Sequence, residues 1–425
     1  MSRSTLAPAP LAALARPLED DWKATLEAVA KAHRWLSTAE PAELGTIVRA
    51  LSDAYNAPNL TPGRAVASSA PALAARLGFS FARDVPKAGA AVRELIASGE
   101  LGVKVTALRV LDLGAGLGAT TWGVARALAA AGRTCTLDVT LTDEDAQALD
   151  VARELARARG GAERQGAATV TLQVRAERLR ASVEAGGRGP WDLILLGQVL
   201  SEMDGGLSDE ERVRRHAELA GGLVAKLAPG GAVVIVEPAL CERTRHLHAV
   251  RDALLGAGAA SLFAPCLHAA PCPALQVPGD WCHEDLAIDL PPWLAPVAKA
   301  AGLRWQGLTF SYLVLRRRGE RALGDFLPRT VARGRVVSSA LVSKGKREHF
   351  LCGDLAAPGD PPLRARVSRL DRDQSDTNAS WDSLGRGDLV ALEPAPDPKK
   401  MRIGRDGAVT VLSPEPPLDR VPRAD

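Results

Sequence analysis

The chain has 425 residues, which is enough for two or three domains with cores of their own. Hydrophobic residues make up 46% and charged residues 24%, and no apolar run reaches the roughly 18 residues that a membrane-spanning helix needs. The net charge of +3 excludes an argument for nucleic-acid binding from bulk charge alone. The N-terminus lacks a signal-peptide pattern, so we expect a bacterial cytoplasmic protein, with an organellar one as the alternative.

Residues 1–100 predict an N-terminal helical region, because their apolar residues recur at helical spacing. Residues 101–325 alternate strands and helices, which indicates βαβ units and a largely parallel sheet. We expect 303–309 and 310–316 to form a terminal hairpin that adds an antiparallel edge. The main strands are expected at 108–113, 136–142, 169–174, 193–196, 232–237 and 310–315.

The last hundred residues change character. Short strands with Gly and Pro breaks over 326–415 predict a small β domain, and 416–425 predict a disordered tail. The predicted fold class is therefore α/β: a Rossmann-like sheet with an N-terminal helical region and a small C-terminal β domain.

A glycine-rich turn follows the first expected strand. It reads Asp112-Leu113-Gly114-Ala115-Gly116-Leu117-Gly118, and a helix is expected after it. Glycines permit positive φ and close approach of a ligand, and the free N–H groups of the helix start attract an anionic group. The loop is one residue shorter than the dinucleotide fingerprint GxGxxG, which favours S-adenosylmethionine over a nicotinamide dinucleotide, the second candidate. Together with the alternating strands and helices, it predicts a Rossmann-like sheet of the class I methyltransferase type. Asp112 would accept a hydrogen bond from the ammonium group of the ligand, or it would orient the loop.

Two further acids complete the expected cofactor site. Asp143 ends the second strand, where a carboxylate can accept hydrogen bonds from both ribose hydroxyls. Glu177 follows the third strand and would lie beside the adenine. A glycine turn with a helix-capping acid and no nucleotide is the structural alternative.

The end of the fourth strand carries no recognisable catalytic signature. Exocyclic-amine methyltransferases have an Asn/Asp-Pro-Pro-aromatic motif here, but this chain continues from Gln198 to Glu202 without it. Gln198 and Glu202 are the candidates to face the methyl group of the cofactor. Cys241, after the fifth strand, is more typical of a helix start than of a nucleophile.

Three cysteines lie in a Pro-rich stretch, 263–292, that is too long for an ordinary connection. They are Cys266, Cys272 and Cys282, and Cys352 follows in the β domain. Four thiolates can hold zinc or a [4Fe–4S] cluster, and the residues alone leave the two open. His268 and His283 are alternative ligands. The pair His246 and His248 indicates a solvated helix face.

A basic connector covers residues 316–347 and includes Arg316-Arg317-Arg318 and Lys344-Gly345-Lys346-Arg347. Such a segment can contact RNA phosphates by releasing counterions. Charge runs are more often solvated faces, so both interpretations stay open.

Taken together, these motifs are similar to those of the methyltransferase-like small-ribosomal-subunit proteins of mitochondria and their bacterial relatives. The resemblance covers roughly residues 65–395. Leu267 departs from the family, which usually has Pro there, and Ser201-Glu202 departs from an Asn-Glu stretch. The matching segments are Ala82-Arg83-Asp84-Val85-Pro86-Lys87, the glycine turn, Val236-Glu237-Pro238, Pro265-Cys266 to Cys272-Pro273, Asp280-Trp281-Cys282-His283, Phe310 to Leu315, Gly345 to Cys352 and Gly387-Asp388-Leu389.

The resemblance implies an S-adenosylmethionine domain with a four-Cys iron–sulfur cluster, and by position Cys266, Cys272, Cys282 and Cys352 would be its ligands. It also implies association with small-subunit ribosomal RNA during ribosome assembly or translation. We therefore expect a methyltransferase acting on ribosomal RNA. The alternatives are an assembly factor that binds RNA without turnover, and a small-molecule methyltransferase with a structural zinc. The resemblance makes a mitochondrial location the alternative to the bacterial cytoplasm.

Overall fold

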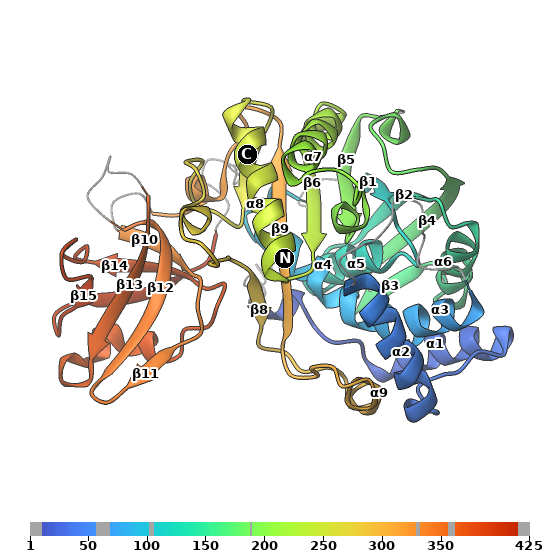
Figure 1. Ribbon diagram of the computed structural model, residues 1–425, viewed down its shortest axis with the longest axis horizontal. Helices are drawn as coiled ribbons and strands as arrows, with labels where there is room; N and C mark the ends of the chain where they lie inside the picture. Colours follow the sequence, from blue (N-terminus) through green and yellow to red (C-terminus); the bar gives the residue numbers. More distant parts are fainter. Residues whose placement is uncertain are drawn as a thin grey trace, which may run out of the picture.

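The computed structural model describes residues 11–56, 69–101, 106–187, 189–328, 332–355 and 362–414. It has two parts, a large mixed sheet covered by helices and a smaller all-β part at one end (Figure 1). The α/β class with a helical N-terminal region and a small β part is confirmed. The tail 416–425 lies outside the described residues. Within the described part of the chain, no helix is long and apolar enough to cross a membrane.

Helices dominate the described residues of the N-terminal region, 11–56 and 69–101. They are η1 (Leu11–Leu14), α1 (Asp20–His33), α2 (Pro41–Asn56), α3 (Ala70–Ala75), a π-helical turn η2 (Arg76–Ser80) and α4 (Phe81–Ala97). A π-helical turn inside a helical run is uncommon and is found mostly at functional sites.

The large sheet follows. Its strands and helices are β1 (Ala107–Leu113), α5 (Ala119–Ala130), β2 (Cys135–Asp143), α6 (Ala146–Ala158), β3 (Ala162–Gln165), β4 (Ala168–Arg178), β5 (Trp191–Gly197), α7 (Asp209–Val224), β6 (Leu227–Glu237), α8 (Cys241–Gly256), β7 (Ser261–Ala264), β8 (Glu284–Leu286), α9 (Ala295–Ala300) and β9 (Leu308–Arg316).

The strand order is β3-β4-β2-β1-β5-β6-β9-β7, and β8 pairs with β9. Strands β4, β2, β1, β5 and β6 are parallel, so their carboxyl ends meet at one edge. The register places Leu113 opposite Thr142 and Gly197 opposite Val236 at that edge. Ligands of open α/β sheets bind at this edge, which fixes where the site has to be sought.

The expected hairpin over 303–316 is wrong. Strand β9 is a single strand that pairs antiparallel with β6 on one side and with β7 on the other. Gly307 adopts a φ of 69° directly before β9, which ends the extended chain there. The antiparallel strand that we expected does exist and is β9 itself, which lies between β6 and β7 and runs opposite to both.

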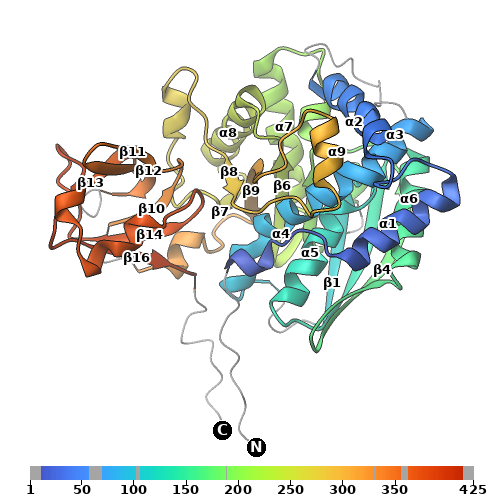
Figure 2. The same ribbon diagram turned by 90° about the horizontal axis from the view of Figure 1, so that it is seen from below.

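Helices cover both faces of the sheet (Figure 2). Alternate residues of each central strand point to opposite faces, so that Val110 and Leu193 pack under α4, α5 and α6, whereas Leu111 and Ile194 pack under α7 and α8. These strands are apolar on both faces, as parallel strands buried on both sides must be.

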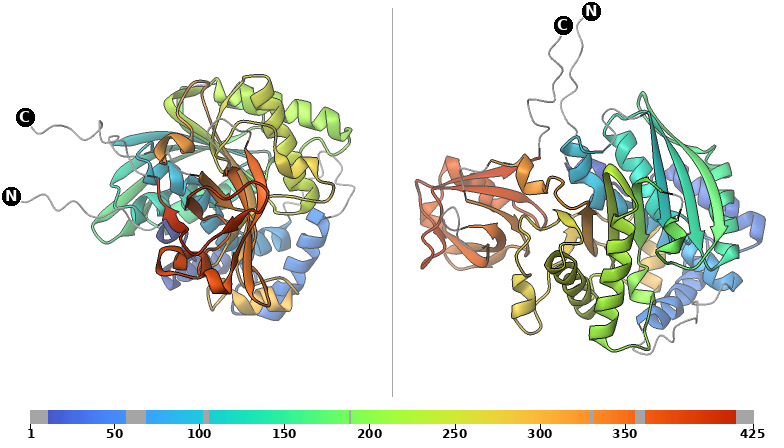
Figure 3. Two further views of the ribbon diagram at one scale, coloured as in Figure 1. Left: turned by 90° about the vertical axis from the view of Figure 1, so that its left-hand side faces the viewer. Right: turned by 90° about the horizontal axis from the view of Figure 1, so that it is seen from above.

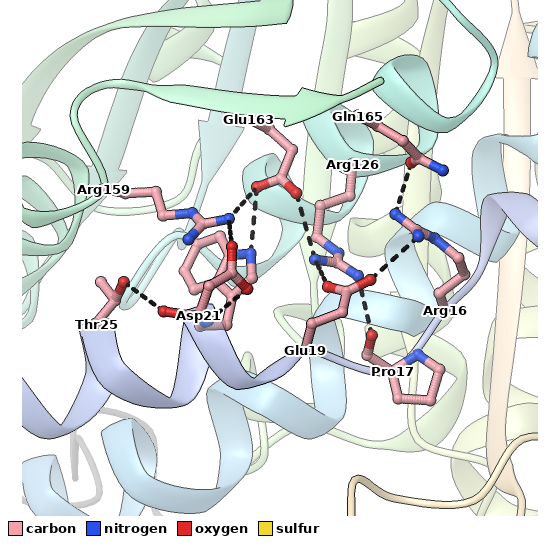
Figure 4. Close-up of polar contacts among 10 residues, drawn as sticks. Arg16, Pro17, Glu19, Asp21, Thr25, Arg126, Arg159, Glu163 and Gln165 are labelled. Carbon is pink, nitrogen blue, oxygen red and sulfur yellow. Dashed lines mark hydrogen bonds and ion pairs between the residues drawn. The ribbon is translucent and has the colours of Figure 1, made fainter. Parts of the chain in front are cut away.

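Helix α1 is fixed to the β3 edge of the sheet by a partly buried ionic network (Figure 4). Glu163 accepts from the Trp22 indole at 3.2 Å and pairs with Arg126 at 3.4 Å. Arg126 also pairs with Glu19 at 2.7 Å, just before α1 begins. The buried guanidinium therefore has two carboxylate partners, which offset the cost of removing its charge from water.

The second part is a separate seven-stranded sheet of order β15-β13-β12-β10-β14-β16, with β11 paired to β12 (Figure 3). Its core includes Trp381 and Val390. Its strands are β10 (Ala332–Val336), β11 (Leu341–Ser343), β12 (Lys346–Asp354), β13 (Leu363–Leu370), β14 (Leu389–Glu393), β15 (Arg402–Ile403) and β16 (Ala408–Leu412), and its short helical turns are η7 (Asp371–Asp373) and η8 (Asp376–Asp382). Further short helical turns precede this sheet in the chain: η3 (Glu184–Gly186), η4 (Leu200–Glu202), η5 (Pro273–Gln276) and η6 (Leu323–Phe326).

Candidate cofactor site and cysteine site

The glycine turn lies between β1 and α5, as the sequence predicts. Gly114, Gly116 and Gly118 have φ values of 68°, 52° and 81°, which residues with a Cβ atom rarely adopt. The buried Asp112 carboxylate accepts from the N–H of Thr121 at 3.2 Å and from its hydroxyl at 2.7 Å. Asp112 therefore holds the first turn of α5 against β1. Of the two roles we expected, this geometry supports the orienting one.

Burial raises the pKa of Asp112 to about 7, against the lowering effect of the Thr121 hydrogen bonds. Between the ordinary value near ~3.9 and about 7, the carboxyl keeps its proton in the folded chain and loses it in the unfolded chain. Raising the pH through this window therefore lowers stability. We expect Asp112→Asn to raise the melting temperature relative to wild type more at pH 8 than at pH 4.5. An equal difference at both pH values would contradict this, and Asp138→Asn on β2 is the control.

Asp143 ends β2 and contacts the glycine turn. One carboxylate oxygen accepts from the Gly116 N–H at 2.7 Å and the other from the Asp145 N–H at 2.9 Å. Asp143 thus fixes the turn and faces the cavity described next. Glu177 lies near the end of β4, where it is exposed and is not among the cavity-lining residues.

A cavity of about 520 Å³ opens at the carboxyl edge of the sheet. Its floor comes from the glycine turn, Asp143 and the ends of β5 and β6, and one wall comes from the helical run 76–87. This volume lies within the range of pockets that hold small-molecule cofactors. The wall residues on that run are Arg76, Phe79, Ser80, Phe81, Arg83, Asp84 and Lys87.

The end of β5 shapes the middle of the cavity. Gln198 has a φ of 62°, which is rare for a residue with a side chain, and its N–H donates to the carbonyl of Val236 at 2.7 Å. The next turn, η4, is capped by Glu237, which accepts from the N–H groups of Leu200 at 2.9 Å and Ser201 at 3.1 Å. Both weak candidates, Gln198 and Glu202, line the cavity.

Glu202 keeps accessible surface because it faces the cavity, yet the surrounding walls remove much of its hydration. This desolvation raises its pKa to about 7, against the lowering effect of Arg76. A carboxyl with such a pKa can accept or donate a proton near neutral pH.

The four cysteines come from a loop and from the other sheet, yet they lie close enough for electrostatic effects among them. Burial, and then the negative charges of Cys266 and Cys272, raise the pKa of Cys282 to about 12. Burial and the other three thiolates raise that of Cys352 as well. The Cys352 Sγ lies 3.6 Å from His268 Nε2. Among the described residues, no three His, Cys, Asp or Glu side chains have the spacing to hold a metal ion.

Helix α8 organises the cysteine loop. The buried Arg251 donates to the carbonyls of His268 at 2.7 Å and Ala270 at 2.9 Å, and Asp252 accepts from the Cys272 N–H at 2.9 Å. The prediction that His246 and His248 lie on a solvated face of a helix is wrong. His248 is buried and lies 2.9 Å from the Cys282 carbonyl, and His246 lies 2.8 Å from the buried His216.

Several cations of the basic connector pair with carboxylates of the protein itself. Arg316 is buried and pairs with Glu100 at 2.7 Å, and Arg333 pairs with Asp354 at 3.1 Å. Arg317, Arg318 and Lys344 are exposed. Part of the positive charge of 316–347 is therefore neutralised by intramolecular ion pairs and is not available to RNA phosphates.

The sequence reasoning missed Arg76, Arg83, Asp84 and Lys87 as cavity residues. The stretch 82–87 did stand out by its resemblance to a family, but it has no chemical signature of its own. Only the packing of the helical run over the glycine turn shows that these side chains share a cavity.

A parallel sheet with a glycine turn after β1, an acid at the end of β2 and an antiparallel β9 defines the class I methyltransferase fold. The family model described as mitochondrial small ribosomal subunit Rsm22 matches residues 86–356, more than half of the chain. The chain belongs to this family.

Solved structures with similar folds include several methyltransferases. TrmN from Thermus thermophilus is 19% identical over 57% of this chain and 53% of its own, with a TM-score of 0.31. The precorrin-6y C5,15-methyltransferase from Geobacter metallireducens is 10% identical over 60% and 91%, with a TM-score of 0.29. An S-adenosylmethionine-dependent methyltransferase from Clostridium acetobutylicum is 15% identical over 32% and 44%, with a TM-score of 0.21. The chain thus spans less than half of the Clostridium protein. No curated protein matches the chain.

Proposed function

We propose that the chain binds S-adenosylmethionine in the 520 Å³ cavity and acts on the small ribosomal subunit, with ribosomal RNA as the methyl acceptor. The observation that carries the cofactor is the cradle of Gly114, Gly116 and Asp143, which lies open to the cavity. Positive φ at the glycines leaves room for a ligand backbone, and the free N–H groups at the start of α5 suit a carboxylate. Family membership supports the ribosomal partner. The expected setting is the bacterial cytoplasm, with the mitochondrion as the alternative.

The cofactor is tested by titrating the full chain with S-adenosylhomocysteine in a calorimeter. We expect saturable binding that Asp143→Ala weakens by about tenfold to a hundredfold, because the variant loses a charged acceptor that also fixes Gly116. Asp138→Ala, on the same strand but away from the cavity, is the matched control. Equal affinity of Asp143→Ala and wild type would contradict the proposed site.

A non-catalytic assembly factor is the second candidate. It is favoured by the end of β5, where Gln198 to Glu202 carry no motif that holds a planar nitrogen. The two candidates separate when small-subunit RNA, free and in particles of increasing completeness, is incubated with labelled S-adenosylmethionine. Transfer at a mapped position supports the enzyme, and binding of cofactor and RNA without transfer supports the assembly factor.

We also propose that the four cysteines hold a [4Fe–4S] cluster, with zinc as the alternative. The proposal is supported by the chemistry of the donor set, because each iron of such a cluster takes one thiolate, and by the mutual electrostatic influence of the cysteines. It stands although no three described side chains have the spacing to hold a single metal ion. When bound, the cluster would join the loop to the small sheet. Four cysteine ligands leave no open iron, so its role here is structural.

A further inference from the structure

The cavity extends well beyond the glycine turn. Asp143 ends β2, and Thr309, which also lines the cavity, begins β9. In the sheet order, β1, β5 and β6 lie between these two strands. Neighbouring strands lie about 4.8 Å apart, so the cavity spans on the order of 19 Å along the sheet edge. A cofactor held at β1 and β2 leaves the β6 and β9 end for the acceptor.

Arg83 lines this cavity without a partner for its charge. Its Nε is buried and makes no hydrogen bond, and no ion pair to Arg83 occurs in the part of the chain that the structure describes. The nearest aromatic ring, that of Phe79, lies 5.9 Å from its guanidinium carbon. Burial lowers the pKa of Arg83, with Asp84 opposing the shift. Arg83 is partly buried, and its enclosed Nε lacks an acceptor, so the guanidinium is suited to pair with an anion supplied from outside.

The other cations of the cavity wall have partners within the protein. Arg76 pairs with Asp145 at 3.3 Å, and Lys87 pairs with Asp84 at 2.8 Å. Arg180 pairs with Glu144 at 3.1 Å, and Arg243 donates to the carbonyl of Tyr55. Within the described residues, Arg83 is thus the lining cation for which neither an ion pair nor a hydrogen bond occurs, whereas Arg243 has a hydrogen bond to a carbonyl but no carboxylate partner.

Position separates Arg83 from the expected place of the cofactor. Arg76, at the start of the helical run, is the arginine at the glycine turn, because a Cβ built on Gly116 would lie 2.6 Å from its Nη2. Arg83 lies seven residues further along this run. It is close enough to Arg304, in the segment before β9, for the two charges to interact. Arg83 therefore belongs to the β9 end of the cavity.

We propose that Arg83 binds a phosphate of the methyl acceptor, and that the acceptor is therefore a nucleotide. The inference rests on the proposed function, because it assumes that the cofactor fills the other end. A planar guanidinium can donate two parallel hydrogen bonds to phosphate, which gives orientation as well as charge. The carboxylate of the cofactor is the other source of an anion, and the experiment distinguishes the two.

The test uses the full chain saturated with S-adenosylhomocysteine and titrated with the four nucleoside 5′-monophosphates and with the corresponding nucleosides. We expect at least one monophosphate to bind about tenfold more tightly than its nucleoside. Arg83→Gln should remove this preference, Arg83→Lys should retain part of it, and neither should change the affinity for S-adenosylhomocysteine more than about twofold. Arg304→Gln is the matched control, because Arg304 is exposed at the same end but does not line the cavity.

Two outcomes would overturn the inference. Weaker S-adenosylhomocysteine binding by Arg83→Gln would assign the residue to the cofactor carboxylate. Equal affinity of wild type and Arg83→Gln for every monophosphate would remove the phosphate subsite while the proposed cofactor site remains. If S-adenosylhomocysteine does not bind at all, the proposed function fails, and the same titration without it still decides whether Arg83 binds phosphate. Melting curves of both Arg83 variants establish that they are folded.

Discussion

Replacing Arg335 by methionine is expected to lower the free energy of unfolding by about 3–5 kcal/mol. Arg335, on β10 of the small sheet, is buried and pairs with the buried Glu94 of α4 at 2.7 Å. It also donates to the carbonyls of Pro265 at 2.7 Å and Gly387 at 2.8 Å. Its loss would leave a buried carboxylate without its cation and two carbonyls without a donor, because the Tyr312 hydroxyl, 3.3 Å from Glu94, compensates only part of that charge.

The measurement is urea unfolding, combined with limited proteolysis to detect separation of the two sheets. The double variant Arg335→Met/Glu94→Leu should recover much of the loss, since it removes both charges together. Arg175→Ala is the control, because Arg175 pairs with Asp138 on the exposed face and should change stability by less than about 1 kcal/mol. A double variant as unstable as the sum of both single variants would show that the pair acts through something other than its charges.

Replacing Cys282 by serine is expected to remove most of the bound iron, or zinc, and to lower the melting temperature by about 10 °C or more. A thiol with a pKa of about 12 is mostly protonated at neutral pH, and a metal is what would stabilise four neighbouring thiolates. The measurement is anaerobic purification followed by iron, sulfide and zinc assays, an absorption spectrum and a melting curve on one sample.

Cys241→Ser is the matched control, because Cys241 begins α8 and is not one of the four proposed ligands. Iron and sulfide in equal amounts would support the cluster, and about one zinc would support the alternative. Loss of the metal in Cys282→Ser at an unchanged melting temperature would contradict a structural role.

The sequence predicted the sheet because its strands carry strong local signals. Runs such as 193–196 are apolar on both faces, and the glycine turn marks the end of β1 without reference to the rest of the chain. The failure at 303–316 has the opposite cause. Antiparallel pairing of β9 with β7 is a non-local contact, and nothing near Gly307 in the sequence specifies the partner.

The same distinction applies to the sites. Asp143 was predicted because the end of β2 has a fixed place relative to the glycine turn. Arg83 and Arg335 were not assigned roles, since their partners or their lack of partners depend on how distant elements pack. His248 was misread because a helix from 241 to 256 looks polar in sequence, whereas the cysteine loop covers its polar face.

The division of the cysteines between the two sheets has a consequence for biosynthesis. Cys266, Cys272 and Cys282 leave the ribosome before β9, the strand that completes the central part of the large sheet, and Cys352 follows only with β12. On the proposed ligand set, a nascent chain that ends before β12 carries three of the four thiols. One that ends before β10 also lacks Arg335, the partner of Glu94. Full ligation would then be reached only by translation products that extend through β12, which makes it a late step in the formation of the fold.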